Sequence, residues 1–402
     1  MNNRPKYINS QSTLTRQQYS SGAISLRILA LGACQSYISI RYSTASHLGS
    51  PHSSQALRQN SQAHLLPYLK MDVGRRFLDQ SFRLPAPPLT ADNLPDQKGR
   101  VCIVTGGYVG VGYELVNMLY QRNATVYVAG RSQAKYDAAH ERLTAAHPRS
   151  EGRLEFLLLD LADLSTTKAT ADFFLAKEQR LDVLVNNAGV MNTPMASKSA
   201  QAYELQIGTN ILGPYLLTKL LLPILEQTAS TSPAGSVRVS WAGSLGIDAA
   251  SPKRGVIFDG TTGAPVPDKS QSMTTYAMTK AGNYFLGSEF ARRYPLDTTT
   301  GKGVLHNSFN PGNLATELAR HTHPILNFFL GFITHPSIFG GYTELYAGWS
   351  EEMGKPEHHG GYVKPWGRPS DVRKDVQAEV GGGGRNAEKF WQWCEKETKA
   401  YV

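Results

Sequence analysis

Short apolar runs alternate with helical stretches from Arg100 to the end of the chain. This alternation is typical of βαβ units, in which crossover helices join parallel strands. Several runs are almost continuously apolar, as strands buried on both faces of a sheet should be. The pattern predicts helices at 112–121, 209–226 and 386–398. The predicted strands are 101–104, 125–129, 155–159, 183–186, 236–241 and 304–309.

The first 98 residues follow a different pattern. Residues 1–70 show no sustained periodicity and are rich in Ser, Gln and Asn, which predicts a disordered leader. Their Arg-containing, acid-free composition is also typical of an organellar transit segment, and a start at Met71 is a third reading. Residues 71–98 form a polar, proline-containing lead-in. We therefore expect one α/β domain, residues 99–402, built on a doubly wound parallel sheet of the Rossmann type.

Composition and charge narrow the class of protein. Of the 402 residues, 41% are hydrophobic, which is enough for a sizeable core. The net charge is +9, but residues 1–71 hold seven of the 41 basic residues and no acidic residue. The remainder is nearly neutral, which gives no support for nucleic-acid binding. No apolar run approaches ~18 residues, so we predict no transmembrane segment.

The three cysteines have neither metal-site nor disulfide spacing. We therefore predict no metal and a reducing compartment. The cytoplasm is the expected location, with the mitochondrion as the alternative if the leader is a targeting segment.

A glycine-rich turn follows the first predicted strand and opens the first predicted helix. The pyrophosphate of a dinucleotide binds bare backbone N–H groups at such a helix N-terminus, where side chains would block it. Glycine also permits the positive φ angles of the turn. The candidate cofactor-binding residues here are Thr105, Gly106, Val109, Gly110, Val111 and Gly112.

The residues after the second predicted strand distinguish two cofactors. Enzymes that prefer NAD place a carboxylate near this point, where it binds the ribose 2′-hydroxyl. Gly130 occupies that place and Arg131 follows it, so nothing repels a 2′-phosphate and a guanidinium can bind it. We therefore predict NADP(H) as the cofactor, with NAD(H) as the alternative if Arg131 is an ordinary surface residue.

Polar turns also follow the third and fourth predicted strands. Ligands of open parallel sheets bind beyond the carboxyl ends of the strands. This places Asp160 and Leu161 near the adenine, and Asn187, Ala188 and Gly189 beside the adenosine ribose. Taken singly, such residues are more typical of helix caps or turns, and their serial placement favours a cofactor site.

Tyr276 and Lys280 provide the strongest indication of chemistry. On a helix, residues four apart lie on one face, so the two side chains project together. An ammonium near a phenol stabilises the phenolate and lowers the pKa of the tyrosine towards neutrality. Such a tyrosine is a general acid and base, and the ammonium is also placed to hold the nicotinamide ribose.

In combination and in this order, the glycine turn, the Asn-Asn-Ala-Gly turn and the Tyr-x-x-x-Lys pair resemble the short-chain dehydrogenase/reductase family over about residues 95–350. The phrase Gly-Tyr-Val-Lys-Pro-Trp-Gly at 361–367 is similar to the retinol-dehydrogenase-like, fungal-type subgroup. Tyr108 and Val109 depart from the family pattern, because many members have Asn and Ser there. Loss of the serine removes one hydrogen bond to the phosphate.

The resemblance implies further site residues. Asn210 matches a family asparagine on the helix after the fourth strand. A family serine follows the fifth strand, and of the candidates Ser240 and Ser244 the alignment favours Ser244. The turn after the sixth strand would contact the nicotinamide end through Pro311, Gly312, Leu314 and Thr316.

The function implied by the resemblance is an NADPH-dependent oxidoreductase that interconverts a carbonyl and an alcohol. Tyr276 would give or take the proton, and Ser244 would hold the carbonyl oxygen. Lys280 would hold the ribose and keep the pKa of Tyr276 low, while Asn210 would position a water that relays protons. A homo-oligomer is expected, as is common in the family.

The region at about 317–350 would cover the substrate, and its apolar stretch 324–333 favours a small lipophilic molecule. The same stretch is compatible with packing on the sheet, with a subunit interface and with contact to a membrane surface. Two alternatives of other classes are a catalytically idle NADPH-binding sensor or scaffold and a nucleotide-sugar epimerase or dehydratase on the same fold.

Overall fold

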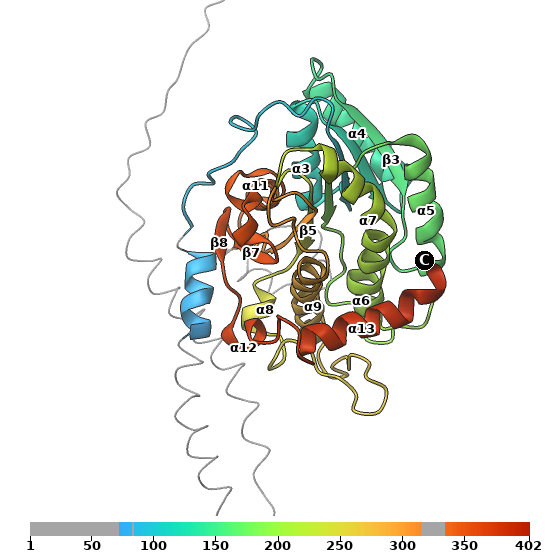
Figure 1. The fold of residues 1–402 in the computed structure, drawn as a ribbon, viewed down its shortest axis with the longest axis vertical. Coiled ribbons are helices and arrows are strands. Elements are labelled where there is room, and N and C mark those ends of the chain that lie inside the picture. Colours follow the sequence, from blue (N-terminus) through green and yellow to red (C-terminus); the bar gives the residue numbers. More distant parts are fainter. Residues whose placement is uncertain (1–71, 83, 315–333) are drawn as a thin grey trace, which may run out of the picture. The chain divides into compact units, whose positions relative to one another are not determined.

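The computed structural model describes residues 72–82, 84–314 and 334–402 (Figure 1). Its centre is an eight-stranded sheet with the order β3-β2-β1-β4-β5-β6-β7-β8. Neighbouring strands run parallel from β3 to β7, and β8 runs antiparallel to β7. The strands are β1 Val101–Thr105, β2 Thr125–Gly130, β3 Arg153–Leu158, β4 Val183–Asn186, β5 Arg238–Ala242, β6 Leu305–Phe309, β7 Gly361–Lys364 and β8 Arg368–Ser370.

Helices cover both faces of the sheet, as the doubly wound fold requires. One buried apolar cluster joins the sheet to α5 Leu164–Lys177, α7 Gly213–Thr231, α9 Ser272–Arg293 and α13 Asn386–Thr398. The other joins it to α3 Gly110–Gln121, α4 Gln133–Ala146 and α11 Ser337–Trp349. The shorter elements are α6 Leu205–Ile207, η1 Gly208–Leu212, α8 Gly246–Ala249, η3 Glu352–Gly354, η4 Pro356–His358, α12 Lys374–Gln377 and η5 Lys399–Tyr401.

The predicted fold class is confirmed, and all six predicted strands are present with small shifts at their ends. Strands β7 and β8 were not predicted; they are four and three residues long and carry glycine and proline at or near their ends. A helix over residues 72–81, inside the expected lead-in, was not predicted either. The described residues all belong to one compact unit, so this helix is part of the domain. The predicted leader, residues 1–70, and Met71 lie outside the described residues.

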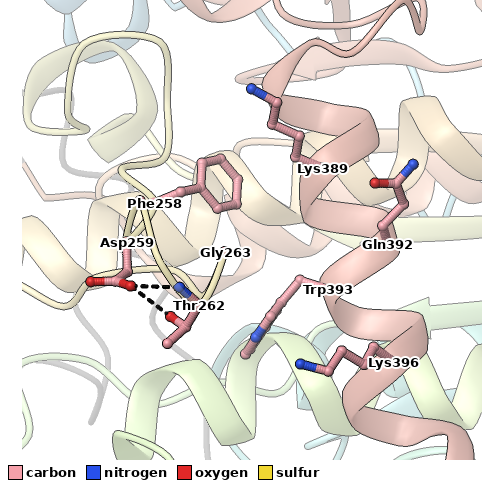
Figure 2. A pocket seen from close by; sticks show the side chains of 9 residues that line it. Phe258, Asp259, Thr262, Gly263, Lys389, Gln392, Trp393 and Lys396 are labelled. Atoms are coloured by element: carbon pink, nitrogen blue, oxygen red, sulfur yellow. Dashed lines mark hydrogen bonds between the residues drawn. The ribbon is translucent and has the colours of Figure 1, made fainter.

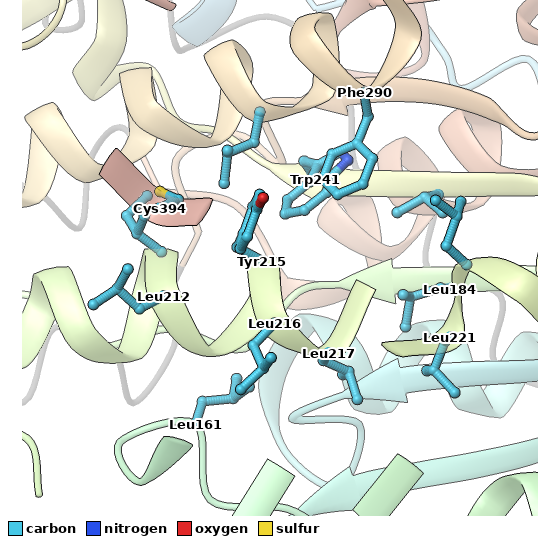
Figure 3. Close-up of a cluster of buried hydrophobic side chains, with 14 of the residues drawn as sticks. Leu161, Leu184, Leu212, Tyr215, Leu216, Leu217, Leu221, Trp241, Phe290 and Cys394 are labelled. Atoms are coloured by element: carbon cyan, nitrogen blue, oxygen red, sulfur yellow. The ribbon is translucent and has the colours of Figure 1, made fainter. Parts of the chain in front are cut away.

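The continuous helical segment Leu205–Thr231 is, by length and composition, able to cross a membrane, but 83% of its apolar window is buried inside the protein. Figure 3 shows Tyr215 of α7 pointing towards Trp241 of β5 and Phe290 of α9, and the Tyr215 and Phe290 ring centroids are 5.8 Å apart. Leu217 and Leu221 of α7 belong to the same buried cluster. Trp391 of α13 covers Tyr215 edge-on, with the ring centroids 5.1 Å apart. The segment therefore behaves as a core helix of this domain.

Candidate active site

The glycine turn lies against the turn that follows β4. Gly106 and Gly110 have φ angles of +68° and +57°, which L side chains rarely adopt. A Cβ on Gly112 would stand 2.5 Å from the amide nitrogen of Asn187, and a Cβ on Gly106 would stand 3.3 Å from Ala188. Gly112 is therefore required by the close approach of the two turns, and Gly106 and Gly110 by the positive φ angles of the glycine turn.

Three of the predicted cofactor residues hold this arrangement together. The Thr105 hydroxyl is fully buried and accepts a hydrogen bond from Ala188 N at 2.9 Å. The Asn187 amide donates to the Thr105 carbonyl at 2.8 Å. These side chains connect the ends of β1 and β4, so they shape the crevice in which the strand order reverses, where such sheets bind nucleotides.

The N-terminus of α3 fits a pyrophosphate. Val109 takes the N-cap position in an extended conformation and provides no side-chain cap, and the first turn of the helix contains no acidic residue. The first N–H groups of α3 are therefore available to an anion, and the helix dipole favours negative charge there. The residues present thus fit the pyrophosphate of a nicotinamide dinucleotide.

The end of β2 carries a feature that sequence reasoning registered only as a departure. The aromatic ring of Tyr108 packs directly over Gly130, where a Cβ would stand 2.3 Å from Tyr108 Cε1. The Tyr108 hydroxyl accepts a hydrogen bond from the Arg131 backbone N–H at 3.2 Å. The Arg131 side chain is exposed. Tyr108 therefore takes the space that a carboxylate-bearing side chain at position 130 would need.

Asp160 and Leu161 follow β3, as predicted. Asp160 Oδ1 accepts from Ala162 N at 2.9 Å and so stabilises the local turn. Leu161 is buried in the core against Gly213, where a Cβ would stand 2.5 Å from the Leu161 carbonyl oxygen. Leu161 is therefore a core residue, whereas the carboxylate of Asp160 has a second oxygen that can face a ligand.

Tyr276 and Lys280 project from one face of α9 into the buried end of the sheet and are 6% and 4% exposed. Lys280 Nζ donates to the Ala242 carbonyl at 3.0 Å and lies 5.6 Å from the centre of the Tyr276 ring. The pair predicted from its spacing is thus confirmed as a spatial pair at the carboxyl end of β5.

The electrostatics of the pair differ from the prediction. Burial raises the pKa of Tyr276 to about 12, and the Ser244 side chain opposes this rise. Burial also lowers the pKa of Lys280 to about 8. The expected lowering of the Tyr276 pKa by Lys280 is not seen in this structure and stays a prediction. Both groups are buried, and desolvation dominates each of them.

A buried carboxyl group also interacts with Lys280. Glu344 of α11 is fully buried, and neither carboxyl oxygen has a hydrogen-bond partner among the described residues. Burial raises the pKa of Glu344 to about 8, and Lys280 opposes this rise. Glu344 could not be predicted as a site residue, because its place on the buried face of α11 depends on the packing of that helix.

The two serine candidates are separated clearly. Ser244 lies in the turn between β5 and α8, beside Tyr276, and its hydroxyl accepts from Gly246 N at 3.0 Å. Ser240 lies within β5, is fully buried, and has no hydrogen-bond partner for its hydroxyl among the described residues. The geometry therefore favours Ser244 as the residue that meets a substrate oxygen.

Asn210 lies in a π-helical turn, η1, a distortion that is frequent at functional sites. Its amide nitrogen donates to Val190 O at 2.9 Å and to Thr279 Oγ1 at 3.1 Å, and its oxygen accepts from Val190 N at 2.8 Å. Asn210 thus holds the chain after Gly189 in place. One lone pair of the amide oxygen remains for a water, so the predicted relay stays a prediction.

The turn after β6 carries the predicted nicotinamide contacts. Gly312 has a φ of +98°, and a Cβ there would stand 2.4 Å from Trp366. Leu314 forms a bridge with His335 and lies close to Gly340 of α11, whose Cβ would also approach Val111. The turn after β6 and the glycine turn therefore both lie against Gly340 of α11.

Parts of the predicted site fall in the gap between 314 and 334. Thr316 and the apolar stretch 324–333 lie outside the described residues. Of the expected substrate cover at about 317–350, α11 packs through buried residues such as Leu345 and Ala347 against the sheet, so this part belongs to the core.

A cavity lies apart from these residues, between the loop at 258–263 and α13 (Figure 2). Phe258 and Trp393 line it, with Lys389 and Lys396 of α13 beside them. Because none of the lining residues belongs to the predicted catalytic or cofactor set, we do not assign this cavity to the active site.

Comparison with known proteins decides the family. The short chain dehydrogenase family model matches residues 100–238. A short-chain dehydrogenase/reductase of Phomopsis amygdali is 44% identical over 323 residues, which cover 79% of this chain and 95% of that protein. The short-chain dehydrogenase/reductase bet4 of Neocamarosporium betae is 38% identical over 326 residues, or 79% and 92% of the two chains. This chain belongs to the short-chain dehydrogenase/reductase family.

Solved structures support the fold of this short-chain dehydrogenase/reductase. An uncharacterized protein from Mycobacterium paratuberculosis has a TM-score of 0.55 and 26% identity, covering 77% of this chain and 97% of that one. RhlG of Pseudomonas aeruginosa, solved as an NADP complex, has a TM-score of 0.50 and 21% identity over 67% and 95% of the chains. The protein is an oxidoreductase that uses a nicotinamide cofactor, and the predicted fungal-type subgroup fits.

Proposed function

We propose that this oxidoreductase is an NADPH-dependent carbonyl reductase that acts on small lipophilic ketones or aldehydes. The observation that carries the proposal is the convergence of Tyr276, Ser244 and Lys280 beside a nucleotide crevice with no carboxylate at position 130. A binding module has no need of such a set of proton-transfer groups. An NADPH preference also favours reduction over oxidation in a cell.

The end of β2 supports NADPH over NADH. A carboxylate there would bind the ribose 2′-hydroxyl and repel a 2′-phosphate, but Tyr108 fills the space next to Gly130. The Tyr108 hydroxyl uses a lone pair towards Arg131 N, so its proton remains free to be donated to a phosphate oxygen. The exposed guanidinium of Arg131 supplies the positive charge.

The catalytic residues support acid-assisted reduction. A bound reduced nicotinamide supplies the hydride. Tyr276 would donate its hydroxyl proton to the carbonyl oxygen, and Ser244 would hydrogen-bond the same oxygen, so the two groups stabilise the negative charge that develops there. Lys280, protonated at pH values below about 8, would return a proton to Tyr276, with a water at Asn210 as the link to solvent.

The substrate class rests on the sequence. The apolar stretch 324–333 favours a lipophilic molecule, and a contact of the same stretch with a membrane surface remains a prediction. The expected homo-oligomer also remains a prediction.

The test is a titration of the full-length protein with NADPH and with NADH, followed through the fluorescence of the bound nicotinamide. Loss of the contacts to the 2′-phosphate should make NADH binding weaker by about tenfold or more. Equal or tighter binding of NADH would overturn the proposed cofactor. Tight NADPH binding without oxidation of NADPH by any lipophilic ketone or aldehyde would favour an idle sensor instead.

A further inference from the structure

The helix over residues 72–81 ends in a buried hydrogen-bonded chain that reaches the active site. Gln80 Nε2 donates to Asp248 Oδ2 at 2.8 Å, and Gln80 Oε1 accepts from Asn310 Nδ2 at 2.9 Å. Asn310 Oδ1 in turn accepts from Gly312 N at 3.0 Å. Gln80, Asp248 and Asn310 are 4%, 1% and 1% exposed, so water does not compete for these groups.

The donor and acceptor of each hydrogen bond in this series follow from the groups at its two ends. The N–H of Gly312 can only donate, so the oxygen of the Asn310 amide must face it. The Asn310 nitrogen then donates to Gln80, whose oxygen accepts. The Gln80 nitrogen then donates to Asp248 Oδ2. Burial raises the pKa of Asp248, but Asp248 Oδ1 accepts from Arg373 N at 2.7 Å and lies 4.0 Å from the Arg76 guanidinium, and both favour the ionised form. An amide is therefore the side chain that satisfies both neighbours at once, and a carboxylate or an alkyl group does not.

The two partners of Gln80 lie on the segments that follow the neighbouring strands β5 and β6. Asp248 lies on α8, four residues after Ser244, and α8 begins at Gly246, whose N–H donates to the Ser244 hydroxyl. Asn310 opens the turn after β6 that carries the predicted nicotinamide contacts. Gln80 thus connects the serine segment with the nicotinamide turn.

Neighbouring contacts hold the helix in this place. Asn313 of the same turn donates to Ser81 Oγ at 2.9 Å. Asp79 accepts from Lys364 and Arg368, which flank the connection between β7 and β8, at 2.9 and 3.2 Å. In Figure 1 the helix is the blue element beside β8. It is therefore anchored to the turn and to the edge of the sheet.

We propose that Gln80 is a positioning residue of the active site, which fixes the nicotinamide turn relative to Ser244 from a helix outside the predicted catalytic domain. This inference rests on the proposed function, because it requires that the turn after β6 holds the nicotinamide. It extends the functional unit to the expected lead-in, residues 71–98.

The test compares two ligands in the full-length protein: NADPH, and adenosine 2′,5′-bisphosphate, which lacks the nicotinamide half. Gln80→Leu should weaken NADPH binding about tenfold, because Asp248 and Asn310 each lose a buried partner. Binding of adenosine 2′,5′-bisphosphate should stay within about twofold of wild type. A variant that is merely less well folded would lose both ligands together.

Gln97→Leu is the matched control. Gln97 is an equally buried glutamine of the same segment, 4% exposed, and donates to Pro95 O at 2.8 Å. It precedes β1 and so lies at the opposite ends of the strands. Gln97→Leu should leave the ratio of the two affinities unchanged, whatever it does to stability.

Gln80→Glu adds a second measurement, the pH dependence of NADPH binding, which should not change if the role of Gln80 is purely structural. A protonated carboxyl can donate to Asp248 and accept from Asn310, as the amide does, whereas an ionised one faces the Asp248 carboxylate. NADPH binding by Gln80→Glu should therefore approach wild type at low pH and fall further below it as the pH rises. This variant also keeps the test open if Gln80→Leu does not fold.

The outcomes are distinguishable. Parallel loss of both ligands by folded Gln80→Leu, or unchanged NADPH binding by Gln80→Leu and Gln80→Glu, overturns this inference alone. Wild-type protein that binds neither ligand overturns the proposed function and this inference with it.

Discussion

Replacement of Gly130 by aspartate tests the structure of the cofactor site most sharply. This single change introduces the carboxylate that NAD-preferring enzymes place after the second strand. In this protein, however, the new Cβ would stand 2.3 Å from Cε1 of Tyr108 and 2.7 Å from its Cζ and hydroxyl oxygen. Such contacts are far inside the van der Waals distance, so the Tyr108 ring must leave its place. The clashing atoms are the far end of a partly buried side chain, so the ring can swing aside, and the cost is about 1 kcal/mol for the lost hydrogen bond to Arg131 N.

Gly130→Asp should therefore lose about 1 kcal/mol or less of unfolding free energy in urea and bind both cofactors poorly, because the displaced ring and the new carboxylate crowd the site. The double variant Tyr108→Ser/Gly130→Asp should bind NADH more tightly than NADPH, because the serine leaves room for the carboxylate. Gly130→Ala is the control, since it adds the same Cβ without a charge and should keep the preference for NADPH.

Two results would refute this reasoning. A Gly130→Asp variant that binds NADPH as tightly as wild type would mean that the side chain at position 130 does not face the 2′-phosphate. A double variant that still prefers NADPH would mean that the choice of cofactor is made elsewhere than at the end of β2.

Three further predictions concern single residues. Arg131→Ala should weaken NADPH binding by about tenfold and leave NADH binding unchanged, as titrations of both cofactors would show; equal effects would remove Arg131 from the phosphate site. Ser244→Ala should lower kcat for ketone reduction by about 10²-fold or more and Ser240→Ala only mildly, and the reverse order would reject the serine assignment. Because burial lowers the pKa of Lys280 to about 8, the ammonium is lost as the pH rises through that value. Reduction should therefore decline above about pH 8, and a flat profile up to pH 10 would contradict this role.

The fold was predictable because six strands are buried apolar runs whose spacing leaves room for helices. The four-residue β7 and three-residue β8 are too short, and too rich in glycine and proline around them, to stand out from loops. The helix at 72–81 was missed for a different reason. Its meaning lies in contacts such as Gln80 to Asp248, 168 residues apart in the chain, which no local pattern encodes.

The site was predictable where motifs fix positions on one element or at the ends of successive strands. Tyr276 and Lys280 share a helix face because their spacing requires it. Their pKa values were not predictable, because these depend on burial by segments far away in the sequence, including α11 with Glu344. Tyr108 shows the same limit, since its contact with Gly130 joins residues from two different strand ends.

The central claim is that Tyr276 is the proton donor in an NADPH-dependent carbonyl reduction. The most direct measurement follows NADPH oxidation at 340 nm with a panel of lipophilic ketones and aldehydes, for wild type and Tyr276→Phe, together with an NADPH titration of both. The account predicts turnover by wild type, a loss of about 10²–10⁴-fold in Tyr276→Phe, and nearly equal NADPH affinity. Turnover retained by Tyr276→Phe would contradict the account.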